Sequence, residues 1–109
     1  MGTRPSATPT LASVRKDLEQ IDRAIVLLVA ARIDAACSAI RLRSQTDGQV
    51  ANPAQERRVT ARAQGWAEEV GMSPVLAEKI FRAIIDAGKE RYMTLTKTET
   101  PTRRTSASD

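Results

Sequence analysis

The stretch LASVRKDLEQIDRAIVLLVAARIDAACSAIRLRS, residues 11–44, decides the fold class of this chain. It contains no Gly or Pro, and one set of positions recurs in alternating steps of four and three residues, which is the spacing of a heptad stripe along one helix face. The stripe consists of Val14, Leu18, Ile21, Ile25, Leu28, Arg32, Ala35, Ala39 and Leu42. We therefore expect one uninterrupted helix of about 34 residues, roughly 50 Å long.

A helix of that length is too long to be covered by the rest of a chain of 109 residues. Its apolar stripe needs a partner along much of its length, and the simplest partner is another copy of the same helix. The sequence therefore predicts a homodimer.

Two shorter helices are expected after the long one. The segment SQTDGQVANP, residues 44–53, combines Gly, Asn and Pro and is typical of a loop. A second helix is expected over about 53–70, and a third from Pro74, with Ser73 as its N-cap, to about Leu95. No segment shows the alternation of a strand, so the predicted fold class is all-α, with three helices per chain in an intertwined helical homodimer.

The two ends of the chain differ in composition from its centre. Residues 1–9 and 96–109 are rich in Thr, Ser and Pro and are expected to be disordered tails, which leaves one helical domain over 10–95. The formal net charge is +4, but between Leu11 and Leu95 there are 13 Lys and Arg against 11 Asp and Glu. The body carries no basic block, so nucleic-acid binding is not expected.

Several other classes of protein are excluded by what the sequence lacks. Cys37 is the only cysteine, so there is no internal disulfide framework, and this is consistent with a reducing compartment. There is no apolar run of about 18 residues and no signal pattern, so we expect a cytoplasmic protein that does not contact a membrane. There is no His, no metal-ligand spacing and no Gly-rich phosphate loop, so we expect no metal site and no Ser–His nucleophilic catalysis.

Arg32 interrupts the aliphatic stripe, and its position has two explanations. A cation there either snorkels or specifies register, or it faces a cavity and binds an anion, because an unpaired buried charge is costly. Arg15 and Arg43 lie 28 residues apart, a whole number of heptads, and Arg43 follows Arg32 by 11 residues. In a dimer these arginines can converge on a polyanion, and the guanidinium fork suits carboxylates. Such a site favours a reaction that needs positioning and charge stabilisation more than proton transfer.

The order of these residues resembles the all-helical chorismate mutase family, chorismate mutase type II. That family places an arginine shortly before an I-D-x-x-I/L run, then a second arginine, a lysine and an E-R pair that opens the second helix. The matching positions here are Arg15, Ile21-Asp22, Arg32, Arg43 and Glu56-Arg57. The resemblance continues through WAEEVGMSPVLAEKIFRAIIDAGKERY and covers residues 11–92.

The resemblance implies an intertwined homodimer that catalyses the Claisen rearrangement of chorismate to prephenate, a step of aromatic amino acid biosynthesis from the shikimate pathway. The reaction needs no cofactor and no general base. Arg32 and the partner's Arg15 would bind the two carboxylates of the substrate. Glu56 would orient a substrate hydroxyl, and Arg43 would take the place of the family's lysine at a carboxylate and the ether oxygen.

Some positions depart from the family pattern. Asn52 stands where many mutases have an aspartate, and Tyr92 stands where a glutamine usually donates to the ether oxygen. Gly88 leaves room one turn earlier for a different ring substituent. If the register of the third helix slips, Lys89 or Arg91 takes the place of Tyr92. The predicted catalytic residues are thus Arg32, Arg43 and Tyr92, and the predicted substrate-binding residues are Arg15, Arg32, Arg43, Asn52, Glu56, Gly88 and Tyr92.

Three other functions stay open beside the mutase. Isochorismate pyruvate lyase, of a salicylate or siderophore route, shares the fold and the cationic pocket, and the stretches NPAQER and WAEEVGM look closer to that branch. A further branch rearranges 4-amino-4-deoxychorismate. The non-enzyme alternative is a helical dimer that binds an anion.

Overall fold

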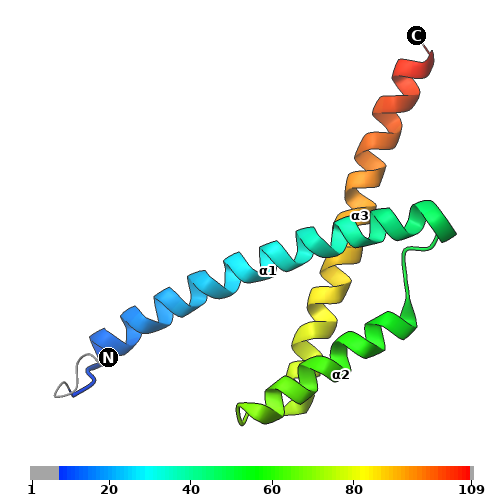
Figure 1. Ribbon diagram of the computed structural model, residues 1–109. Helices are drawn as coiled ribbons and strands as arrows, with labels where there is room; N and C mark the ends of the chain where they lie inside the picture. Colours follow the sequence, from blue (N-terminus) through cyan, green and yellow to red (C-terminus); the bar gives the residue numbers. More distant parts are fainter. Residues whose placement is uncertain (1–7, 109) are drawn as a thin grey trace. The chain divides into compact units, whose positions relative to one another are not determined.

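The computed structural model describes the backbone of residues 8–108 and the side chains of residues 8–97. Over this range the chain forms three helices, α1 Leu11–Asp47, α2 Pro53–Glu69 and α3 Pro74–Ser108, as Figure 1 shows. Within 8–108 no residue is in a strand. The all-α prediction with three helices is confirmed, but α3 has 35 residues and is nearly as long as α1 with 37.

Helix α1 begins and ends where local signals place it. The amide of Ser13 donates to Oγ1 of Thr10 at 3.1 Å, and the amide of Thr10 donates to Oγ of Ser13 at 3.0 Å, so two of the unpaired donors of the first turn are satisfied reciprocally. The helix passes the expected end at Ser44 and stops at Asp47, before Gly48 at φ +74°. The left-handed conformation at Gly48 ends the helix.

The two connections in the second half of the chain are capped by their own side chains. Oδ1 of Asn52 accepts a hydrogen bond from the amide of Gln55 at 3.2 Å and so caps the start of α2. Gly71, at φ +76°, follows the end of α2. Oγ of Ser73 then accepts from the amide of Leu76 at 3.2 Å and opens α3. This tight turn lets α2 and α3 pack side by side as antiparallel neighbours.

Helix α3 does not end near Leu95 as expected but extends to Ser108. The residues that follow, LTKTET at 95–100, include no Gly or Pro to stop a helix. The expected disordered tails stay predictions: residues 1–7 and 109 lie outside the described part of the chain, as do the side chains from residue 98 onward.

The tertiary contacts of the chain divide into two units, the first ending at Ala30 and the second beginning at Ala31. The second unit contains the core, in which α1, α2 and α3 each contribute small or aliphatic side chains. The buried apolar residues are Cys37, Ile40, Val59, Ala63, Ala67, Ala77 and Ile85. Small side chains such as the three alanines allow the helices to approach closely.

The first unit leaves its apolar stripe uncovered. The stripe residues Val14, Leu18, Ile21, Ile25 and Leu28 are between 41% and 70% exposed. Isolated exposed apolar side chains are normal in proteins, whereas a continuous stripe at heptad spacing is typical of an association surface. The stripe supports the homodimer, which stays a prediction for this single chain.

Candidate functional site

A cavity of about 140 Å³ lies within the second unit, between the last part of α1, the start of α2 and the middle of α3. Its apolar wall comes from alanine, valine and isoleucine side chains. Its polar lining consists of Arg32, Arg43, Asn52, Gln55, Glu56 and Lys89. Three of these six are cations and one is an anion, so the cavity is positively charged and its walls are largely apolar.

Arg32 lines the cavity, and its guanidinium group has no partner among the described residues. The residue is partly buried. It makes no hydrogen bond or ion pair with any residue that the structure describes, although most partly buried arginines have a protein partner. A guanidinium in this position is available to an anion that enters the cavity.

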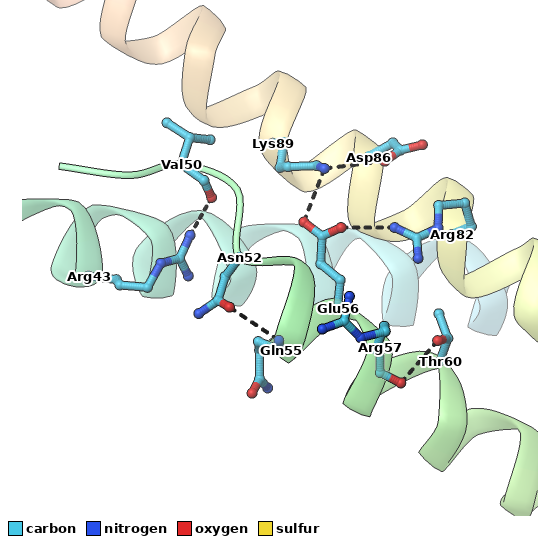
Figure 2. Close-up of polar contacts among 10 residues, drawn as sticks. All are labelled: Arg43, Val50, Asn52, Gln55, Glu56, Arg57, Thr60, Arg82, Asp86 and Lys89. Atoms are coloured by element: carbon cyan, nitrogen blue, oxygen red, sulfur yellow. Dashed lines mark hydrogen bonds and ion pairs between the residues drawn. The ribbon is translucent and has the colours of Figure 1, made fainter. Parts of the chain in front are cut away.

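Arg43 lines the same cavity but is partly engaged by the loop after α1. Its Nη2 donates to the carbonyl of Val50, as Figure 2 shows, and more weakly to the carbonyl of Gln49 at 3.4 Å. Its Nε is enclosed and has no hydrogen-bond partner among the described residues. Arginine carries five N–H donors on a planar fork, so one nitrogen holds the loop while other donors remain for a ligand.

The two amides of the cavity are occupied by local structure. Oδ1 of Asn52 caps α2 through the amide of Gln55. Oε1 of Gln55 accepts from Nε and Nη2 of Arg58 at 3.0 and 2.8 Å. Asn52 therefore lines the cavity and also caps α2. Its Nδ2 remains as a hydrogen-bond donor for a ligand.

The carboxylate of Glu56 forms ion pairs with two cationic side chains of α3, one at each oxygen. Nη1 of Arg82 lies 2.9 Å from Oε1, and Nζ of Lys89 lies 3.1 Å from Oε2 (Figure 2). Burial alone would raise the pKa of Glu56, but the hydrogen bonds and charges of Lys89 and Arg82 hold it below its ordinary value of 4.5. The carboxylate therefore stays ionised at neutral pH and links α2 to α3.

The lowered pKa of Glu56 predicts a pH dependence of folding stability. Because the folded pKa lies below the unfolded one, this stabilisation is fully present above the unfolded value and is lost as the pH falls through the folded value. Glu56→Gln is expected to reduce the free energy of unfolding at pH 7 by about 1–2 kcal/mol. It should also flatten the loss of stability between about pH 5 and pH 3. Urea unfolding at a series of pH values measures both effects.

The matched control for that experiment is Glu78→Gln, since Glu78 lies on α3 and is exposed. This variant is expected to keep the wild-type pH profile. An identical acid-induced loss of stability in wild type and Glu56→Gln contradicts the prediction.

Gly88 lies at the close approach of α1 and α3 and not in the lining of the cavity. An added Cβ would lie 3.1 Å from Cβ of Ala36, which is tighter than ordinary contact. The missing side chain thus lets the two helices pack. The prediction that Gly88 makes room for a ring substituent is not tested by this geometry and stays a prediction.

Gly88→Val is expected to lower the free energy of unfolding by about 1–3 kcal/mol, because a branched side chain overpacks the helix contact. Gly65→Val in α2 is the control. Nothing lies within 4 Å of a Cβ at Gly65, and valine has the better helix propensity. Thermal unfolding of both variants measures the difference, and equal stability of the two contradicts the packing role of Gly88.

Tyr92 does not line the cavity. Its hydroxyl lies 3.1 Å from Oγ of Ser44, with which it shares a hydrogen bond. Arg91 borders a separate hollow between α1 and α3 and lies 3.5 Å from Oδ1 of Asp34. The polar residue of α3 that lines the cavity is Lys89, one of the two alternatives considered above, and the predicted role of Tyr92 stays a prediction. The spacing of four residues between Lys89 and the buried Ile85 places both on one face of α3, a signal that the sequence contained.

Arg15 belongs to the first unit, where it is exposed and makes no hydrogen bond or ion pair with the described residues. Of the predicted site residues, the cavity brings together Arg32, Arg43, Asn52 and Glu56. The described residues contain no group of three or more Cys, Asp or Glu side chains that could hold a metal ion. Among them there is also no helical stretch with the length and apolarity needed to cross a membrane.

Comparison with known protein families matches residues 14–92 to chorismate mutase type II. The match covers most of the chain and includes every residue that lines the cavity. The chain belongs to the chorismate mutase type II family. No curated protein and no solved structure matches it. Membership of this family supports a function in chorismate chemistry.

Proposed function

We propose that this protein catalyses the rearrangement of chorismate to prephenate in the cavity lined by Arg32 and Arg43. The observation that carries the proposal is that the partly buried Arg32 lines a cavity with largely apolar walls and that its guanidinium has no partner among the described residues. A cation left in this state is ready to bind a carboxylate, and it does so more strongly where water is excluded.

The reaction suits such a cavity because it is intramolecular. The carbon–oxygen bond of the enolpyruvyl ether breaks while a carbon–carbon bond forms on the ring, and negative charge develops on the ether oxygen. Guanidinium groups that hold the two carboxylates can fix a flexible substrate in its reactive conformation. A cation near the ether oxygen stabilises the transition state more than the ground state.

The proposal includes a second copy of the chain. The cavity volume of about 140 Å³ is less than the ~300 Å³ or more of typical small-molecule pockets, which favours a site that a second chain completes. The uncovered stripe from Val14 to Leu28 gives a dimer its contact surface. In such a dimer the partner's Arg15 supplies a further cation for the second carboxylate, and the partner helix closes the cavity.

The deciding experiment is a substrate comparison with the purified protein. Incubation with chorismate should cause loss of its diene absorbance and formation of prephenate, and no loss at high enzyme concentration overturns the mutase. Release of pyruvate from isochorismate identifies the lyase instead, and turnover of 4-amino-4-deoxychorismate alone identifies the third branch. If no substrate reacts but chorismate raises the melting temperature, the protein is an anion-binding dimer.

A further inference from the structure

Helix α3 contributes two residues to the cavity lining, the buried apolar Ile85 and Lys89. Any polar contact between a ligand in this cavity and a lining side chain of α3 is therefore a contact with Lys89. The side chain of Lys89 is 28% exposed, so much of it is covered by the surrounding helices. The ion pairs of a partly buried lysine are screened less by water than those of a fully exposed lysine.

The ammonium of Lys89 is held in place by carboxylates. Nζ lies 3.1 Å from Oε2 of Glu56, and 3.7 Å from Oδ1 of Asp86, as Figure 2 shows. Asp86 is largely exposed at 59%, so the close and shielded partner is Glu56. An ammonium has three donors, and the contact with Glu56 occupies one of them at hydrogen-bond distance. Lys89 is thus oriented and still has donor capacity.

The other cationic and hydroxyl side chains on this part of α3 have contacts elsewhere. The hydroxyl of Tyr92 shares its hydrogen bond with Ser44 outside the cavity lining. Arg91 pairs with Asp34 and borders the separate hollow. Arg82 contacts Oε1 of Glu56 and does not line the cavity. Lys89 alone among these four lines the cavity that also contains Arg32 and Arg43.

We propose that Lys89 is the α3 residue that contacts the substrate, as the third cation of the cavity beside Arg32 and Arg43. This rests on the proposed function and assigns a contact that a neutral side chain at position 92 was expected to make. A fixed positive charge at this side of the cavity stabilises negative charge that develops during the rearrangement, and a neutral donor does so less strongly. Its effect therefore belongs mainly to kcat.

The test is steady-state turnover of chorismate by Lys89→Met, which keeps most of the apolar stem and removes the charge. We expect kcat to fall about 10- to 100-fold with a smaller change in KM, as for the loss of a charge-assisted contact. Lys89→Arg should recover part of the loss. The matched control is Lys79→Met on the same helix, because Lys79 is exposed and outside the cavity lining. A kcat of Lys89→Met within about threefold of wild type overturns the proposal.

A purely structural role of Lys89, in which it only supports Glu56, has a different signature. In that case Lys89→Met causes no further loss when it is added to Glu56→Gln, because the supported group is already gone. We expect a further fall in kcat in the double variant, and a double variant equal to Glu56→Gln overturns the proposal. Circular dichroism and the melting temperature of each variant establish that it is folded.

Failure of the proposed function is distinguished by the wild type. If the wild-type protein turns over no chorismate, the mutase proposal fails, and Lys89 is judged by binding. The rise in melting temperature caused by chorismate should then be smaller in Lys89→Met than in wild type and unchanged in Lys79→Met. An equal rise in Lys89→Met and wild type overturns the assignment of Lys89.

Discussion

Replacing Arg32 by alanine is expected to reduce kcat/KM for chorismate by more than about 100-fold, equivalent to at least about 3 kcal/mol of transition-state stabilisation. Arg32 is the lining cation without a partner among the described residues, so its charge is not already used by the fold. Its removal leaves a substrate carboxylate without this charged partner in a cavity whose walls are largely apolar. Steady-state kinetics of the purified variant measures the loss.

Two further variants separate the charge from the shape of the side chain. Arg32→Lys keeps the charge but loses the fork, and we expect it to recover only part of the activity. Arg23→Ala removes an exposed arginine from the same helix and is expected to leave activity unchanged. If Arg32→Ala retains nearly wild-type kcat/KM, the arginine has a structural role in the helix stripe instead of a role in binding.

The second large effect is expected at the exposed stripe of the first unit. Ile25 lies in the middle of the stripe and is 51% exposed in the single chain. Ile25→Glu places a charge where two copies of α1 are proposed to meet, and burial of an unpaired charge is costly. We expect the dissociation constant of the dimer to rise by a factor of about 100 or more. Such a rise corresponds to a loss of ~3 kcal/mol of binding free energy, and an unpaired buried charge at each of two symmetric positions costs at least that much. Sedimentation measures the dimer.

Activity should follow the dimer in that experiment. If the partner's Arg15 completes the site, Ile25→Glu loses turnover at protein concentrations where it is monomeric and recovers some at higher concentration. Ala30→Glu is the control, because Ala30 lies on the opposite side of the helix from the stripe and is exposed. Wild-type protein that sediments as a stable monomer and is active at all concentrations contradicts the shared site.

Some helix boundaries could be predicted from the sequence and others could not. The start of α2 at Pro53 and of α3 at Pro74 followed from local signals that act within one turn of helix, a proline at the first helical position and, for α3, the N-cap Ser73. The end of α3 did not, because no Gly or Pro follows Leu95 before Pro101, and the helix continues past that proline to Ser108. The arginines of α1 were found because one cation in an apolar stripe is conspicuous at fixed spacing, and Glu56 because it opens the second helix in the family pattern.

What the sequence by itself determined is the set of helices and the face of each helix on which a residue lies. These follow from periodicity and capping, which are local properties. The sequence also contained the family relationship, which the match of residues 14–92 to chorismate mutase type II confirms. The side chains that share one cavity were decided by the tertiary structure, since they depend on where α1 and α3 approach at Ala36 and Gly88.

The close approach of α1 and α3, together with the packing of α2 on α3, brings Lys89 and Glu56 into contact in the cavity. It also places the hydroxyl of Tyr92 at hydrogen-bond distance from Ser44. It is also the tertiary structure that directs part of Arg43 to the loop carbonyl of Val50. The physical reason is that spacing along a chain specifies directions around one helix axis. The distance between side chains of different helices is set by how the helices pack.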